Sequence, residues 1–192
     1  MIPSRQEIAY RVFGAWLLAR LDASGAQYFD ESPQAALRSF FAALLVAPAF
    51  LAILLLTRED APPVDAPVVV LVTLLCYSLL WTAYPLIAYR VCQTIDREQA
   101  FFRYLAATNW ASIIAYHFQL LVVILMVGLL PEILMPLVGL ALRACLLAYA
   151  WFIARSCLKV SGMAAAGFVV LEFIVAMFIQ IIAIGILYPE VP

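Results

Sequence analysis

The chain has 192 residues, of which 67% are hydrophobic and only 12% are charged, and its formal net charge is −1. A soluble domain carries about 25% charged residues, roughly twice this share. This composition excludes a soluble enzyme, a disordered chain and a nucleic-acid-binding protein, and it predicts a single-domain membrane protein.

Residues 1–32 precede the first long apolar run and are predicted to be a cytoplasmic N-terminal segment. Ser4 followed by Glu7 matches a helix cap with an acid three residues later, so we expect a helix from about Arg5 to Leu21. On a helical wheel its narrow polar face comprises Glu7, Arg11, Gly14 and Asp22, and Trp16 lies among the apolar residues. Such a helix either lies in the membrane interface or packs beneath the transmembrane helices, and both alternatives stay open.

Five later segments are apolar and long enough to cross a bilayer, which takes about 20 residues. These predicted spans are 39–56, 68–89, 104–130, 133–154 and 162–187. The first helix is expected to begin at Ser32-Pro33 and to kink at Pro48. The stretch Leu130-Pro131-Glu132 leaves room only for a tight turn between antiparallel neighbours. The predicted fold class is therefore all-α: a polytopic five-helix bundle over residues 33–192 with an N-terminal interfacial helix.

The distribution of basic residues predicts the orientation of these spans. Placing the N-terminus inside puts nine Arg and Lys residues in the cytoplasm and one outside, whereas the reverse orientation inverts that ratio. The sequence therefore predicts an N-inside, C-outside topology. Ten Arg against the single Lys159, with abundant Ala and Leu, is typical of a GC-rich bacterial genome, so the expected location is the bacterial inner membrane.

Two charged residues lie deep inside predicted spans, where charges are costly and usually functional. Arg143 lies in the fourth span and Glu172 in the fifth, each roughly 10–15 Å from one end at 1.5 Å per residue. Because the two spans are consecutive and antiparallel, we expect the side chains to pair. Such a pair either fixes the helix register or serves as a proton relay or substrate clamp.

The third span carries a polar stripe whose members share one helix face: Asn109, Ser112, Tyr116 and Gln119. His117 lies about a quarter-turn away. Side chains of this kind either hydrogen-bond between helices or line a wet cavity shared with Arg143, Glu172 and Gln180. The candidate intramembrane cluster is thus Arg143, Glu172, His117, Asn109, Tyr116, Gln119 and Gln180. A lone His and four Cys without CxxC spacing predict neither a metal site nor a cofactor.

Aromatic and small residues complete the pattern of a membrane protein. The Trp residues are expected at the membrane interfaces, where aromatic side chains gather: Trp16, Trp81, Trp110 and Trp151. Small residues from Gly162 to Gly167 favour close packing of the fifth span against a neighbour. That neighbour is another helix of this chain, a second copy or another membrane protein. The predicted partners are therefore the lipid bilayer and one of these proteins.

Two short strings resemble the bacterial branch of the Yip1-like membrane protein family. They are Arg38-Ser39-Phe40-Phe41-Ala42-Ala43 at the first span and Asn109-Trp110-Ala111-Ser112 in the third. The resemblance implies five spans, a cytoplasmic N-terminal segment and an external C-terminus. The DLYGP-type motif of the eukaryotic branch does not occur in this chain, so the trafficking and small-GTPase partners of that branch do not carry over.

Three classes of function are compatible with these features. Short loops and the lack of a catalytic set favour a non-enzymatic membrane protein that binds partners or organises membrane, such as an accessory or scaffolding subunit. The alternative is a small transporter or channel that uses the cluster around Arg143 and Glu172. An intramembrane enzyme is disfavoured because Glu172 is the only carboxylate deep in a span.

Overall fold

The computed structural model describes residues 2–57 and 61–189, and this part of the chain is helical with no strand. The elements are α1 (Arg5–Ala19), the 3₁₀ helix η1 (Ala23–Tyr28), α2 (Pro33–Ser39), α3 (Phe41–Leu56), α4 (Ala66–Thr94), α5 (Glu98–Leu129), the 3₁₀ helix η2 (Glu132–Leu134), α6 (Met135–Leu158) and α7 (Gly162–Leu187). The all-α fold class predicted from the sequence is confirmed.

Five helical stretches are long and apolar enough to cross a membrane, as the hydropathy pattern predicted. They are Pro33–Leu56, Ala66–Thr94, Glu98–Leu129, Glu132–Leu158 and Gly162–Leu187. Helices α4 and α5 extend beyond the predicted spans at the ends where they approach each other in sequence. Charged residues there end the apolar run, but they do not interrupt backbone hydrogen bonding, so the helices continue past it.

The first span is interrupted at Phe40, between α2 and α3. The Ser39 hydroxyl donates to the carbonyl of Ala36 (2.6 Å) and accepts a bond from the Asn109 amide nitrogen (2.8 Å). Helix α3 then continues on both sides of Pro48, the residue at which a kink was expected. The interruption therefore lies where a side chain of α5 binds the helix, not at the proline.

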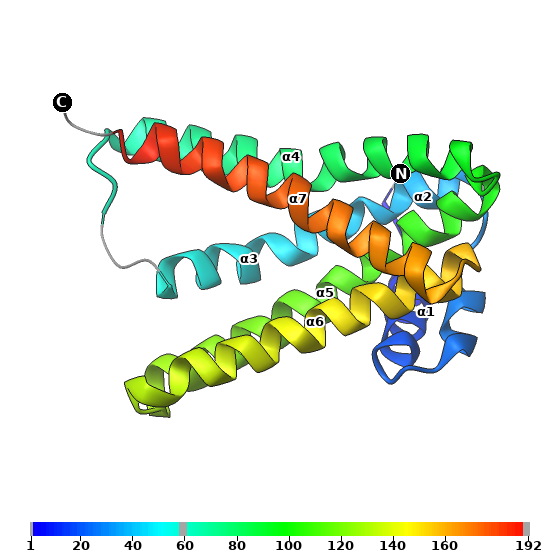
Figure 1. Cartoon of the computed structure of the whole chain (residues 1–192), viewed down its shortest axis with the longest axis horizontal. Coiled ribbons are helices and arrows are strands. Elements are labelled where there is room, and N and C mark those ends of the chain that lie inside the picture. Colours follow the sequence, from blue (N-terminus) through cyan, green and yellow to red (C-terminus); the bar gives the residue numbers. More distant parts are fainter. Residues whose placement is uncertain (1, 58–60, 190–192) are drawn as a thin grey trace.

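The spans are arranged as two helix pairs that diverge (Figure 1). Helix α4 runs beside α7, and α5 runs beside α6, which confirms the predicted antiparallel hairpin at residues 130–134. The pairs lie close together at the end that carries α1, which we call the α1 end, and separate toward the end that carries the α5–α6 turn, the turn end. Helix α3 packs against α5 between the two pairs.

The N-terminal segment packs beneath the bundle and also exposes aromatic side chains. The Arg11 guanidinium is buried and donates to the Tyr28 carbonyl and to the Asp30 carboxylate (2.5 Å). The Tyr149 hydroxyl of α6 donates to the Ala15 carbonyl (2.7 Å), which fastens α1 to the bundle. The exposed large side chains of α1 are Tyr10, Phe13 and Trp16.

The wheel-based interpretation of α1 is therefore corrected. Arg11 and Gly14, assigned to the polar face, point into the protein, because an ion pair and a close backbone contact are made on that side. Of the residues that the wheel placed on the apolar face, Phe13 and Trp16 point outward, whereas Ile8 and Val12 pack against the core.

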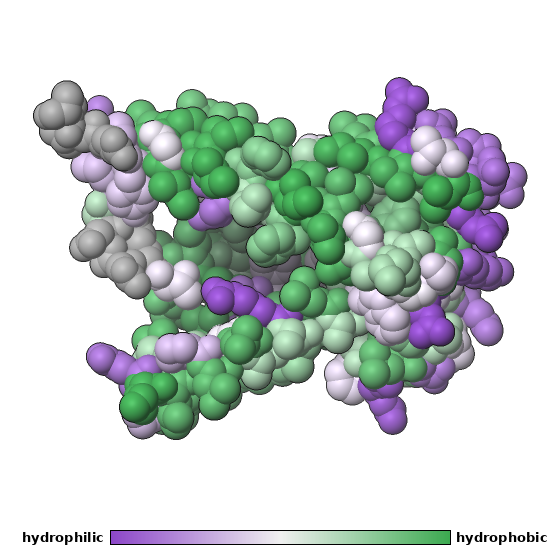
Figure 2. All heavy atoms as spheres, viewed as in Figure 1, coloured by the Kyte–Doolittle hydropathy of each residue, from purple (hydrophilic) through white to green (hydrophobic). Residues whose placement is uncertain are grey.

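The distribution of surface hydropathy matches a protein embedded in a membrane (Figure 2). Hydrophobic side chains cover the middle of the molecule, and hydrophilic ones gather at the α1 end. Between α7 and α6 the surface is hollowed, with hydrophilic side chains along the hollow. The compact hydrophobic core lies toward the α1 end, where α1, α4, α5, α6 and α7 meet.

Candidate functional site

The polar face of α5 is longer than the stripe found in the sequence. Tyr104, Thr108, Ser112, Tyr116 and Gln119 follow one another at intervals of three or four residues, so they share one face of the helix. At 1.5 Å per residue, this face extends about 16 Å from Thr108 to Gln119. It runs from the α1 end toward the turn end.

Two small cavities adjoin this face of α5. The first, which we call the α4-side cavity, has a volume of about 180 Å³ and lies between α4, α5 and α7. The second, the α6-side cavity, has a volume of about 200 Å³ and lies between α5, α6 and α7. The two cavities share five lining residues: Tyr104, Thr108, Ser112, Tyr116 and Glu172. They are therefore neighbouring parts of one polar site inside the bundle.

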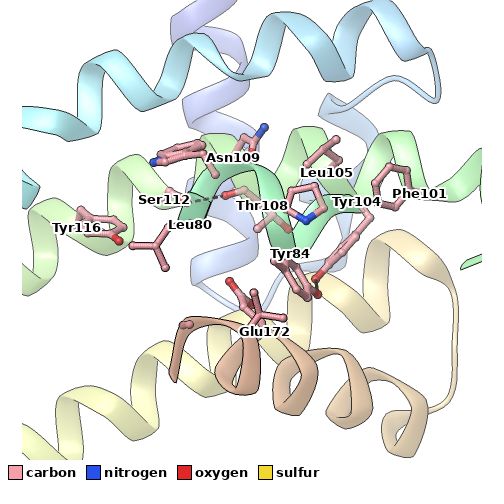
Figure 3. Close-up of a pocket in the computed structure, with 14 residues that line it drawn as sticks. Leu80, Tyr84, Phe101, Tyr104, Leu105, Thr108, Asn109, Ser112, Tyr116 and Glu172 are labelled. Atoms are coloured by element: carbon pink, nitrogen blue, oxygen red, sulfur yellow. Dashed lines mark hydrogen bonds between the residues drawn. The ribbon is translucent and has the colours of Figure 1, made fainter. Parts of the chain in front are cut away.

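Glu172 supplies the only carboxylate in the walls of these two cavities. It lies on α7, ten residues after Gly162 and so about 15 Å from the α1 end of that helix. Figure 3 shows its side chain pointing from α7 toward the polar face of α5. Glu172 is half-buried, and it makes no hydrogen bond or ion pair with any residue that the structure describes.

Two buried tyrosines close the site toward the α1 end. The hydroxyls of Tyr84 and Tyr104 are hydrogen-bonded at 2.5 Å, and the Tyr84 hydroxyl also donates to the Phe168 carbonyl of α7 at 3.3 Å. The Tyr104 and Phe168 rings pack edge-to-face with centroids 5.8 Å apart. These contacts join α4, α5 and α7 at one level of the bundle.

Thr108 contributes a buried hydroxyl that has no hydrogen-bond partner among the described residues. Its backbone carbonyl accepts a bond from the Ser112 hydroxyl (3.0 Å), so the latter is already engaged (Figure 3). Buried polar groups are nearly always satisfied by protein, water or ligand. The Thr108 hydroxyl in the wall of both cavities therefore indicates a place for water or a bound molecule.

The structure brings together four of the seven residues of the predicted cluster. Glu172 and Tyr116 line both cavities, Asn109 lines the α4-side cavity and Gln119 lines the α6-side cavity. Asn109 is buried and bonds to Ser39 of the α2 helix, as expected for a polar group that joins helices. In the polar stripe of α5, Asn109 therefore joins two helices by a hydrogen bond, whereas Tyr116 and Gln119 line the cavities.

The predicted pair between Arg143 and Glu172 is wrong. Arg143 is exposed and forms no ion pair in the described part of the chain. It lies about 12 Å from the turn end of α6, whereas Glu172 lies about 22 Å from the turn end of α7. The two residues are therefore at different depths, and α6 and α7 diverge toward the level of Arg143 (Figure 1).

His117 and Gln180 also lie outside the site. His117 is exposed, and its Nδ1 lies 2.7 Å from the Ile113 carbonyl of its own helix. Gln180 is exposed and lines a separate cavity with Thr57 and Thr73 near the turn end. The positions of these two residues in the sequence indicate how deep they lie in the bundle, but not whether their side chains point into the site or away from it.

The prediction that all four Trp residues lie at the membrane interfaces is corrected for two of them. Trp110 is 2% exposed and belongs to the core, because α5 is covered at the α1 end by α1, α2, α3, α4 and α6. Trp81 lines the α4-side cavity. Trp151 donates to the Gly162 carbonyl (2.8 Å) and lies beneath Arg155, and Trp16 is half exposed, so both remain candidates for interface contacts.

Sequence reasoning missed Tyr84, Tyr104 and Thr108. Extending the stripe backward from Ser112 in steps of four residues would have found Thr108 and Tyr104. Tyr84 had no such signal, because its position opposite Tyr104 depends on how α4 packs against α5.

The described residues contain no group of three His, Cys, Asp or Glu side chains that would hold a metal ion. The arrangement instead offers one carboxylate, hydroxyls and aromatic rings in an enclosed space. No family model, curated protein or solved structure matches this chain.

Proposed function

We propose that this chain is a small multi-pass transporter of the bacterial inner membrane that binds a cation at Glu172. The observation that supports this proposal is an unpaired carboxyl group that faces two cavities inside the bundle. Ionisable residues at such depth are rare, and they usually mark the pathway of an ion or substrate. The proposal requires no catalytic step.

The charge of the site favours a cation as the transported species. A carboxylate removed from water is costly unless a proton, another positive charge or several hydrogen-bond donors compensate it. No Arg, Lys or His lines either cavity, so the protein itself does not supply that positive charge. A bound cation would supply it.

The shape of the site favours transport over permanent binding. The polar face of α5 leads from Thr108 to Gln119, and both residues line the α6-side cavity between α5, α6 and α7. At the opposite side, the hydrogen bonds among Tyr84, Tyr104 and Phe168 close the site. A carrier needs such a pair of routes, one open and one closed, whose roles exchange during the cycle.

The test is cation flux into liposomes that contain the purified protein. We expect the wild-type chain to give flux of a monovalent cation or proton, and Glu172→Gln to reduce it at least tenfold. His117→Ala is the matched control, because that side chain is polar, lies in the same bundle and lines neither cavity. Equal flux from the Glu172→Gln variant and the wild type would overturn the proposal.

A second candidate is a non-enzymatic accessory or scaffolding protein of the Yip1-like kind. It is favoured by Arg143, a charged residue that is exposed within a span and has no acidic partner among the described residues. An acidic side chain of another membrane protein or of a second copy would satisfy it. Purification in mild detergent, followed by quantitative mass spectrometry, should then recover a stoichiometric partner that Arg143→Leu releases.

A further inference from the structure

The α4-side cavity combines aromatic rings with a single carboxyl group. Its aromatic lining residues are Trp81, Tyr84, Phe101, Tyr104 and Tyr116, and Glu172 supplies its only carboxyl group. They come from three different helices, so the folded bundle assembles them around one space (Figure 3). Aromatic ring faces attract cations, and clusters of them with few other groups bind alkylated ammonium ions in particular.

The cavity contains a single carboxyl group, that of Glu172. Dedicated sites for hard divalent cations such as Ca²⁺ combine several carboxylates with other oxygen ligands, six or more in all. The Glu172 carboxyl and the hydroxyls of Thr108 and Tyr116 make no hydrogen bond with any residue that the structure describes. A single carboxyl group suits a monovalent cation better than a divalent one.

The remaining walls are apolar. Leu80, Leu105 and Val175 line the same cavity as Glu172 and the aromatic rings. Such walls contact alkyl groups favourably but offer nothing to the hydration shell of a small inorganic ion. The volume of about 180 Å³ limits the ligand to a small molecule.

We infer that the cation bound at Glu172 is a small alkylammonium ion, held by the carboxylate and by the aromatic rings of the α4-side cavity. This inference rests on the proposed cation-transport function and specifies its substrate class. Glu172 supplies the opposite charge, the rings of Trp81 and its neighbours contact the alkyl groups, and the Thr108 hydroxyl faces the same space.

The test is calorimetric titration of the full chain in lipid nanodiscs with tetramethylammonium, sodium and potassium chloride at constant ionic strength. We expect saturable binding of tetramethylammonium alone. Glu172→Gln should abolish it, and Trp81→Leu should weaken it roughly tenfold through loss of the ring. Trp16→Leu is the matched control, because Trp16 lies on the exposed face of α1 and should leave the affinity unchanged.

Folding is checked by the thermal unfolding of each variant in the same nanodiscs. If Trp81→Leu unfolds early, Trp81→Phe retains a ring and should bind with a smaller loss than a variant without one. Tetramethylammonium affinity equal to that of the wild type in Trp81→Leu would overturn the role of the rings.

The outcomes separate this inference from the proposed function. If sodium or potassium binds in a way that depends on Glu172 and tetramethylammonium does not bind, the alkylammonium inference is wrong. The proposed cation site at Glu172 would still stand. Proton flux that depends on Glu172, without binding of any of the three salts, would likewise overturn the alkylammonium inference and leave the proposed transport of a cation at Glu172. No binding and no flux that depends on Glu172 would overturn both proposals.

Discussion

At the scale of single residues, Gly14 is placed where no side chain fits. A Cβ atom there would lie 2.4 Å from the Tyr28 Cβ and 3.2 Å from the Gly25 carbonyl oxygen. Gly14 also lies in the middle of α1, where alanine would otherwise favour the helix by about 1 kcal/mol. The close approach of α1 and η1 therefore outweighs helix propensity at this position.

We expect Gly14→Ala to lower the free energy of unfolding by about 1–3 kcal/mol, because the added methyl group must push η1 away from α1. Thermal unfolding of the purified protein in detergent measures the effect. Gly167→Ala is the matched control: it lies inside α7 with no atom near its added Cβ, so it should be neutral or stabilising. Equal melting temperatures for the two variants would contradict the packing described.

The hydrogen bond from Asn109 to Ser39 is a second feature of single residues with a measurable effect. Both residues are buried, at 4% and 0% exposure, and the bond joins α5 to the end of α2. Asn109→Ala should cost about 1 kcal/mol, the usual range for such bonds within membranes. In a double-mutant cycle with Ser39→Ala the costs should be less than additive; strict additivity would show that the bond contributes nothing.

At the scale of elements, α1 is held to the bundle both by an apolar face, which includes Ile8, Val12, Ala15 and Leu18, and by a few specific polar contacts. The Tyr149 hydroxyl bonds to the Ala15 carbonyl, and Arg11 and Asp30 connect α1 to the segment that follows η1. Tyr10, Phe13 and Trp16 are left outside. Packing beneath the bundle and contact with lipid are thus compatible, since they use opposite faces of one helix.

We expect Tyr149→Phe to loosen α1 selectively. Losing one buried hydrogen bond of about 1 kcal/mol should speed amide hydrogen exchange over Arg5–Ala19 about fivefold, with no change in α7. Tyr10→Phe serves as the control, because the Tyr10 side chain is 52% exposed on the outer face of α1. Uniformly faster exchange in every helix would show that the bond stabilises the whole bundle instead.

At the scale of the whole molecule, the two ends of the bundle differ in charge. The hydrophilic residues gather at the α1 end (Figure 2), and the helix ends and turns there carry most of the Arg and Lys residues of the chain. The positive-inside rule predicts that this end faces the cytoplasm. The turn at η2 is then expected to face the outside.

Labelling of intact cells with a membrane-impermeant maleimide checks this orientation. In a background with both Cys76→Ser and Cys145→Ser, which removes the two cysteines that are not buried, we expect Glu132→Cys at the turn end to react in intact cells and Lys159→Cys at the α1 end to react only after lysis. The unmodified background supplies the control, since Cys92 and Cys157 are fully buried. If Lys159→Cys reacts in intact cells and Glu132→Cys reacts only after lysis, the orientation of the protein in the membrane is the opposite of the one predicted.

The amino-acid sequence alone was enough to predict the membrane-spanning helices, their approximate ends and the polar residues that share one face of α5. An apolar run of given length must form a helix in a membrane, because its backbone groups find no other hydrogen-bond partners there. The spacing of Ser112, Tyr116 and Gln119 likewise places them on one face through the geometry of the helix alone.

The packing of the helices, in contrast, sets which helix faces meet and at what depth. Arg143 and Glu172 lie on consecutive antiparallel helices, but the axial offset and divergence of α6 and α7 keep them apart. Tyr84 meets Tyr104 because α4 packs against both α5 and α7 at that level. The offsets and crossing angles of helices depend on side-chain packing along several helices at once, so no single segment of the sequence contains them.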